Sequence, residues 1–319
     1  MSERIRERNS RAVPAFRLRA APICRFVALL CIAVGIDSIS RGENIAIPGG
    51  ATVDLEFASP PNAALRGVAR QWIQKSARAV VTYYGAFPVR RVILRITPTA
   101  GRESASGQTF GWDGALITID LGRDATKSSL KDDWMLTHEM IHLALPNLAE
   151  RHHWLEEGIA TYVEPIARAR AGELKPAQVW NELVENLPQG EPEKGDRGLD
   201  HTATWGRTYY GGALFCLRAD VEIRRRTGNR FGLEHAVRGI MAAGGSIESS
   251  WKIERVLAAG DAATGLHVLR ELYDEMKAAP APVDLAALWK QLGIVPRGKS
   301  VTFDNSAPLA AVRKAIAGG

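Results

Sequence analysis

Alternating apolar and polar residues predict strands in the first part of the chain. "ATVDLEF" (51–57), "RVILRIT" (91–97) and "ALITIDL" (115–121) each place hydrophobic residues at about every second position. This period is typical of a strand with one buried face. A stretch rich in Gly and Ser separates the second and third segments and is predicted to be a loop.

A helical period takes over elsewhere along the chain. Apolar residues between Ser59 and Gly85 fall on one helical face, with Ser59 as the predicted cap and Gly85 as the end. From Ser129 the pattern is almost wholly helical until "SVTFD" near the end, apart from a long polar loop at 187–200 that is predicted to be mobile or to cover a site. Strands first and helices afterwards predict an α+β fold.

The first forty residues have the pattern of a targeting segment. Seven Arg residues precede "FVALLCIAVGI" (26–36), and small residues follow at Ser38 and Ser40. This order is typical of a secretory signal with possible cleavage before Arg41, which predicts a secreted or periplasmic protein. An uncleaved anchor that reaches back to Ala20 is the alternative, and membrane contact is expected only in that case.

Charge and cysteine content exclude some classes of protein. The net charge is +6, and residues 1–40 carry +4 of it, so the rest of the chain gives no reason to expect nucleic acid. Cys216 is the one cysteine after residue 40, so the predicted mature chain cannot form an internal disulfide. It lies in the apolar stripe "ALFCLRAD", which is typical of an inert core position.

The segment "SSLKDDWMLTHEMIHLALP" (128–146) carries the strongest chemical signal. A capping box of Ser129 and Asp132 predicts a helix that ends at Pro146. His138 and His142 are four residues apart, so their imidazoles project from one face about 6 Å apart and can both reach a zinc ion. Glu139 can reach a water on that ion and act as its general base.

Several residues nearby compete for the place of third ligand. A metzincin site would need Gly at 145 and His at 148, where this chain has Leu145 and Leu148. His152 and His153 follow the turn at Pro146, where a short loop seldom points a side chain back at the preceding helix. We expect helix-start or surface roles for both. "HHWLEEGIATYVE" (152–164) predicts a second helix, in which Gly158 permits close helix approach.

"HEMIH" followed by "WLEEGIATYVE" resembles the gluzincin metallopeptidases, whose W-x-x-E-G-x-A helix provides the third zinc ligand. The resemblance makes Glu157 that ligand and Glu156 its solvent-facing neighbour. Fourteen residues lie between His142 and Glu157, which is shorter than is usual for the alanyl aminopeptidases. Glu164 matches an acid often present in these helices, either as a hydrogen-bond partner of a ligand histidine or as a surface acid.

"RTYYGGALFCLRADVEIRRRTGN" (207–229) resembles the Y-x-x-G-A-L helix of the glycyl and alanyl aminopeptidase families. The resemblance implies that Tyr209 donates a hydrogen bond to the oxyanion, with Gly212 and Ala213 as the small residues behind it. Tyr210 takes that role if the register is shifted by one residue. Either tyrosine could instead be a buried aromatic at a helix start.

The family also uses the strand before the zinc helix to bind the substrate main chain. "FGWDGALITIDLG" (110–122) is predicted to be that edge strand, which suits peptide binding by strand addition. Asp113 could pair with a substrate amino terminus, although a hairpin turn also explains it.

These observations predict a thermolysin-like catalytic domain with a small mixed-sheet N-lobe and a helical C-lobe. The expected divisions are a signal or anchor at 1–40, an N-lobe with the zinc helix at 41–147, and a helical C-lobe at 148–319. The predicted function is hydrolysis of peptide or protein substrates by one Zn²⁺ and its water, in the manner of an aminopeptidase. The family's large N-terminal β-domain has no room here, so an endopeptidase of envelope or secreted proteins is an alternative. A non-catalytic zinc protein is another.

Overall fold

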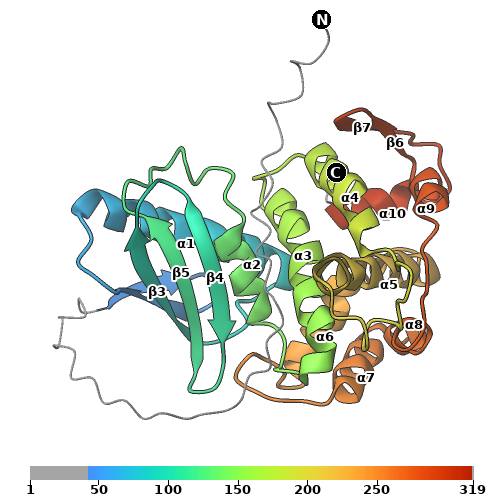
Figure 1. Ribbon diagram of the computed structural model, residues 1–319, viewed down its shortest axis with the longest axis horizontal. Coiled ribbons are helices and arrows are strands. Elements are labelled where there is room, and N and C mark those ends of the chain that lie inside the picture. Colours follow the sequence, from blue (N-terminus) through green and yellow to red (C-terminus); the bar gives the residue numbers. More distant parts are fainter. Residues whose placement is uncertain (1–41, 318–319) are drawn as a thin grey trace, which may run out of the picture. The chain divides into compact units, whose positions relative to one another are not determined.

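Five strands form one mixed sheet in the computed structural model, which describes residues 42–317 (Figure 1). The sheet order is β1-β2-β3-β5-β4, with β2, β3 and β5 parallel and β1 and β4 antiparallel at the two edges. The strands are β1 (Glu43–Ile47), β2 (Ala51–Phe57), β3 (Arg91–Thr99), β4 (Ser104–Phe110) and β5 (Ala115–Gly122). The three predicted strands are therefore present.

The alternation of β3 and β5 explains why these strands were visible in the sequence. Val92, Leu94 and Ile96 of β3 are fully buried, and β5 buries Ile117 beside Leu94 in register. Every second side chain of these strands thus faces the core.

Strand β4 was missed, because "SASGQTF" has small and polar residues where a buried strand would have apolar ones. It is an edge strand that pairs with β5 alone, so one side of its backbone needs no partner strand. The prediction that 110–122 forms the edge strand is wrong, because its strand β5 lies inside the sheet and β4 pairs on its outer side. The strand that flanks the zinc helix at the edge of the sheet is β4.

Ten α-helices make up most of the remaining described chain and confirm the α+β prediction. They are α1 (Ala63–Tyr84), α2 (Met135–His142), α3 (His153–Arg170), α4 (Pro176–Asn186), α5 (Gly212–Thr227), α6 (Leu233–Ala242), α7 (Ile253–Thr264), α8 (Val268–Met276), α9 (Leu285–Leu292) and α10 (Ala310–Ala317). The fold also contains three short helical turns, η1 (Glu150–His152), η2 (Leu187–Gly190) and η3 (Arg207–Gly211). A hairpin is formed by β6 (Ile294–Arg297) and β7 (Ser300–Phe303). The expected lobe boundary at residue 147 stays a prediction.

Two predicted helix starts differ from the observed ones. Asn62, and not Ser59, caps α1, because its Oδ1 accepts a hydrogen bond from the Leu65 amide at 2.7 Å. Helix α2 begins at Met135, because Ser129 is used in a turn with Thr126 and donates to the Arg102 carbonyl at 2.6 Å. Helix α2 also ends at His142, before the predicted Pro146.

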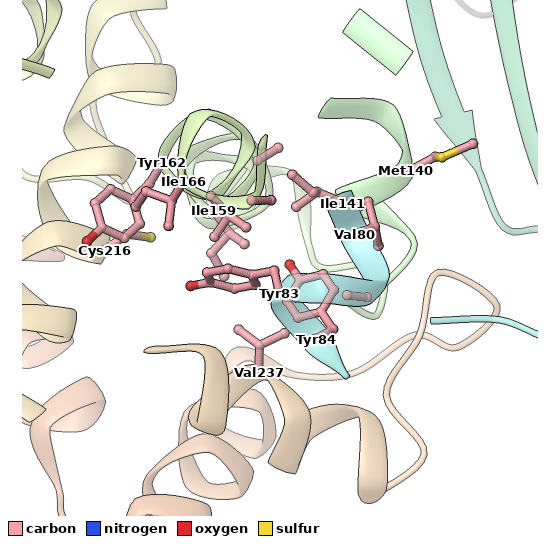
Figure 2. Close-up of a cluster of buried hydrophobic side chains, with 14 of the residues drawn as sticks. Val80, Tyr83, Tyr84, Met140, Ile141, Ile159, Tyr162, Ile166, Cys216 and Val237 are labelled. Atoms are coloured by element: carbon pink, nitrogen blue, oxygen red, sulfur yellow. The ribbon is translucent and has the colours of Figure 1, made fainter. Parts of the chain in front are cut away.

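A dense aromatic and aliphatic cluster lies behind α2 and α3 (Figure 2). Tyr83 and Tyr84 at the end of α1 meet edge to face, with ring centroids 5.1 Å apart. Ile141 of α2 and Ile159 of α3 point into the same cluster and are almost fully buried. The apolar faces of α2 and α3 are therefore fixed in the core, which leaves their opposite faces to form a site. Cys216 is buried beside this cluster, as the sequence predicted.

Helices α3 and α5 approach each other backbone to backbone. A Cβ added to Gly158 would lie 2.3 Å from the carbonyl carbon of Gly212, and one added to Gly212 would lie 2.0 Å from the Trp154 oxygen. No real Cβ tolerates such distances. The predicted close approach at Gly158 is confirmed, and its partner is α5.

The predicted signal or anchor at 1–40 lies outside the described residues. Within residues 42–317, no helix is long and apolar enough to cross a membrane.

We expect Gly158→Ala to lower the free energy of unfolding by about 1–3 kcal/mol, because its methyl group would force α3 and α5 apart. Urea denaturation of the variant and of wild type measures the difference. Gly67→Ala is the matched control, because Gly67 is exposed in α1 and its added Cβ meets no atom within 4 Å. That variant should be about 0.5–1 kcal/mol more stable than wild type. Equal stability of the two variants would contradict the close packing.

Candidate active site

Helices α2 and α3 bring together the three predicted metal ligands. Both imidazole Nε2 atoms converge on one carboxylate oxygen, with Glu157 Oε2 lying 3.3 Å from His138 and 3.6 Å from His142. The three ligand atoms all lie within 4.8 Å of one another. Because α2 ends at His142 and α3 begins at His153, the intervening turn suffices to place Glu157 against the histidine pair.

This donor set fits a single zinc ion. Tetrahedral zinc with bonds of about 2.0–2.2 Å places its ligand atoms roughly 3.3 Å apart. The two separations to Glu157 Oε2 are close to that value. Two imidazoles and one carboxylate also leave a fourth position for water, as in catalytic sites.

Charge within the group favours a cation. Burial lowers the pKa of His142, but the hydrogen bond and charge of Glu157 outweigh burial and raise it to about 9. Burial raises the pKa of Glu157, yet contacts with His138 and His142 hold it well below its ordinary value. Glu157 is thus an anion that attracts positive charge, which a metal ion would supply in place of protons.

Glu139 belongs to α2, and its side chain faces the edge strand β4. The Thr109 hydroxyl lies 2.7 Å from Glu139 Oε2 and 3.0 Å from the Glu139 carbonyl oxygen, so it can donate to either. Gly107 leaves room for the carboxylate, because a Cβ there would lie 2.7 Å from Glu139 Oε1. Strand β4 therefore orients the predicted base.

Tyr209 lines the cleft together with the ligands, and Tyr210 does not. Burial, then the negative charges of Glu157 and Glu139, raise the pKa of the Tyr209 phenol, so the phenol keeps its proton. Tyr210 packs partly buried against the hydrophobic core. The structure therefore favours the register that the resemblance implied, with Tyr209 facing the ligands.

The turn that carries Tyr209 is a π-helical turn, η3, directly before α5. Single π turns are frequent at functional sites. Buried Arg207 holds this turn, because its Nη1 donates to the Gly190 carbonyl at 2.5 Å and its Nε lies 2.8 Å from Asp196. Gly190 touches the backbone of Tyr210, where a Cβ would lie 2.2 Å from the carbonyl carbon.

The loop before η3 is fixed to the helices on either side. Asp200 accepts hydrogen bonds from Trp154 Nε1 at 2.9 Å and from the Tyr273 hydroxyl at 2.7 Å, and it lies 3.1 Å from His152 Nδ1. These contacts connect the loop to α3 and α8. The loop at 187–200 is therefore anchored through Asp196 and Asp200, and its predicted role as a mobile segment or a cover over a site stays a prediction.

The two histidines that follow Pro146 have different surroundings. His152 is buried next to Asp200, at the start of α3, as expected for a helix-start residue. His153 lies at the cleft, with Nε2 3.3 Å from Glu157 Oε1 and Nδ1 3.1 Å from Glu156 Oε2. His153 thus contacts the ligand carboxylate through the oxygen that the other two histidines leave open. Glu156 is half-buried and also accepts from the Leu148 amide at 3.0 Å.

Glu164 and Asp113 lie away from the cleft. Glu164 is buried, so the surface alternative is wrong, and its carboxylate bonds to Arg168 Nη1 at 2.8 Å in place of a ligand histidine. Burial raises the pKa of Glu164 to about 8, against the opposing charge of Arg168. Asp113 is exposed on the turn between β4 and β5 and is not among the cleft-lining residues, which favours the hairpin-turn interpretation.

The cleft has a volume of about 550 Å³, which is enough for a small organic ligand or a few amino-acid residues. It is lined by strand β4 and the turn after it, by α2, and by α3 together with Tyr209. Its apolar lining comes from Phe110, Trp112, Trp134, Met135, Leu145, Leu148 and Ile247.

Sequence reasoning missed the residues that β4 contributes to this cleft. Thr109 and Gly107 carry no motif, and the Gly and Ser residues around them predict a loop where β4 lies. A short alternation around "GQTF" (107–110) was the available signal, and it was too weak beside the Gly and Ser residues. Trp134, next to the zinc motif, was treated as part of a helical pattern.

Comparisons with known proteins bear on the fold. No protein-family model and no curated protein matches this sequence. A solved aminopeptidase N family protein from Idiomarina loihiensis is 14% identical, with a TM-score of 0.61 over 80% of this chain and 50% of that one. An M1 zinc metallopeptidase from Deinococcus radiodurans is 15% identical, with a TM-score of 0.47 over 76% of this chain and 54% of that one.

The chain spans about half the length of these structures. At this identity the likeness to the Idiomarina protein shows a shared fold, in keeping with the predicted metallopeptidase-like architecture.

We expect the purified protein to bind one zinc ion per chain, measured by elemental analysis after dialysis against a weak chelator. His142→Ala should weaken zinc binding more than about 100-fold, because loss of even a supporting partner costs 10- to 100-fold. His201→Ala is the matched control, because His201 is exposed and outside the group. Unchanged stoichiometry and affinity in His142→Ala would exclude this site.

Proposed function

We propose that this protein is a zinc-dependent metallopeptidase that hydrolyses peptide bonds, with aminopeptidase-like action. One observation carries the proposal: His138, His142 and Glu157 converge in a cleft that also contains Glu139 and Tyr209. A metal site that only clamps two helices needs neither a general base nor a phenol beside it. The shared fold with an aminopeptidase N family protein supports the same conclusion.

His138, His142 and Glu157 would hold the zinc ion. When bound, zinc would supply Lewis-acid chemistry that polarises a peptide carbonyl and makes a water more acidic. Glu139 accepts the proton of the attacking water and returns it to the leaving amine, so no net proton is consumed. The Tyr209 phenol donates a hydrogen bond to the oxygen on which negative charge develops.

Contacts on β4 support this role for Glu139. The Thr109 hydroxyl bonds to Oε2 at 2.7 Å, and Oε1 faces the space beside Gly107. We infer that Oε1 is the oxygen that takes the proton, because Oε2 is engaged. A carboxylate fixed in this way needs no reorientation when the proton moves.

An endopeptidase is a second candidate function, and the free edge of β4 favours it. Gly107, Gln108, Thr109 and Phe110 line the cleft along a strand that pairs on one side only, so a substrate could extend along it in either direction. Peptides with free and with acetylated amino termini separate the two candidates. An aminopeptidase cleaves the free form alone, and an endopeptidase cleaves both.

We also propose that the protein is exported. The Arg-rich start and the apolar run at 26–36 support a secretory signal, with an uncleaved membrane anchor as the alternative. Amino-terminal sequencing of the protein recovered from a cell that exports it tests for cleavage before Arg41.

We expect Glu139→Gln to lower kcat by about 10²–10⁴-fold while the zinc content stays at one per chain, because Gln cannot accept the proton and is not a ligand. Hydrolysis of a peptide library and elemental analysis measure the two effects. Activity near that of wild type would exclude Glu139 as the base. Loss of zinc in the variant would show that Glu139 acts on the metal site itself.

We expect Thr109→Val to lower kcat by about 10- to 100-fold with little change in KM, because a hydrogen bond to a charged group contributes about 1.5–3 kcal/mol. Thr109→Ser keeps the hydroxyl and should restore most of the activity, which a role in packing alone would not explain. Zinc affinity should be the same in both variants. Equal kcat in Thr109→Val and Thr109→Ser would contradict an orienting role for the hydroxyl.

A further inference from the structure

Three tryptophans are the exposed large hydrophobic side chains of the described chain. Trp112, Trp134 and Trp205 are 85%, 47% and 57% exposed. The other five tryptophans are buried or half-buried: Trp72, Trp154, Trp180, Trp251 and Trp289. The fold thus buries other tryptophan side chains. It leaves these three in contact with water, without the stabilisation that burial of their apolar surface would give.

The three exposed rings come from separate parts of the chain: two line the candidate active site, and the third packs beside Tyr209 and Tyr210. Trp112 follows β4, with its ring 5.9 Å from that of Phe110, and it lines the cleft. Trp134 directly precedes α2, lines the cleft, and meets the ring of His138 edge to face at 5.4 Å. The ring of Trp205 lies 5.8 Å from that of Tyr209, which lines the cleft, and 5.3 Å from that of Tyr210.

Chance exposure does not explain this placement. An isolated exposed apolar residue is ordinary, whereas an aromatic group gathered around one concave site is typical of a binding surface. Four aliphatic or sulfur-containing side chains also line the cleft: Met135, Leu145, Leu148 and Ile247. Trp112 and Trp134 therefore lie at the margin of the cleft that contains the metal ligands, and Trp205 extends the aromatic rim beyond Tyr209.

We propose that this rim, formed by Trp112, Trp134 and Trp205, selects polypeptide segments with aromatic or large aliphatic side chains beside the scissile bond. The proposal rests on the proposed peptidase function and adds the substrate class. Trp134 touches the ligand His138, and Trp205 touches Tyr209, so a side chain packed on either ring belongs to a residue close to the reacting carbonyl. The unpaired edge of β4 would hold the main chain of such a segment, which leaves its side chains to the rim.

Calorimetric titration of zinc-loaded Glu139→Gln tests this inference without hydrolysis. The ligands are two pentapeptides of equal charge with free amino termini, one with Phe and Leu as its first two residues and one with Ala and Ser there. We expect the Phe–Leu peptide to bind at least tenfold more tightly, with a negative heat-capacity change because apolar surface is buried. Trp134→Ala and Trp205→Ala, each in the Glu139→Gln background, should each reduce that preference about fivefold or more.

Matched variants separate loss of the rim from loss of structure. Trp134→Phe keeps an aromatic surface and should retain most of the preference. Phe231→Ala removes a half-buried aromatic ring outside the cleft-lining residues and should leave the preference unchanged. Equal affinity for the two peptides, or a preference untouched by both Trp→Ala changes, would overturn the proposal. Tighter binding of a peptidoglycan sugar fragment than of either peptide would also overturn it, in favour of sugar stacking.

Failure of the rim proposal and failure of the proposed peptidase function give different results in these experiments. If Glu139→Gln binds the Phe–Leu peptide through the rim but wild type cleaves no peptide, the rim stands and the peptidase function fails. If wild type cleaves polar and apolar peptides at equal kcat/KM, the peptidase function stands and the rim proposal fails.

Discussion

The contact between Gly158 and Gly212 sets the geometry on which the candidate site depends. Two packed helices ordinarily lie 8–10 Å apart at their axes, with side chains between them. Here the backbones of α3 and α5 touch, because neither glycine has a side chain. Glu157 directly precedes one glycine and Tyr209 lies three residues before the other. The close approach therefore brings the third ligand and the phenol to the same cleft.

Buried polar contacts hold this helix pair in register with the rest of the fold. Asp200 joins the start of α3 to α8 through Trp154 and Tyr273, and Arg207 joins η3 to the preceding loop. A buried charge left without its partner is strongly destabilising, so such pairs specify one arrangement more than they add stability. We infer that these anchors serve to keep Tyr209 facing Glu157.

The structure brings together His138, His142 and Glu157, which the sequence predicted as metal ligands from helical spacing and from a resemblance. His138 and His142 share a face because they are four residues apart, and Glu157 followed from a resemblance carried by a nearly continuous motif. Tyr209 was identified in the same way, although its π-helical turn was not. Spacing within a helix is local, so the sequence contains it.

What could not be predicted depends on contacts between distant segments. Glu139 meets Thr109 across thirty positions, through a strand whose small and polar residues hid its existence. Glu164 has the spacing of a helper to a ligand, yet Arg168 on the next turn takes its hydrogen bond. The ring of Trp205 packs against that of Tyr209 because of the turn η3, and no sequence pattern predicts this contact. In each case the contact of the side chain is set by tertiary packing, which no local sequence pattern specifies.

The helices and the edge strand supply different groups to the candidate site. Helices α2 and α3 supply the charged groups, whose positions are fixed by the core behind them. Strand β4 supplies main-chain polar groups at the edge of the sheet and touches Glu139 through Thr109 and Gly107. Glu139 is part of α2, and its carboxylate is oriented by β4. The strand that orients the proposed base would therefore also align a peptide that pairs with it. Substrate alignment and base alignment are then one structural requirement, and a change in β4 disturbs both together.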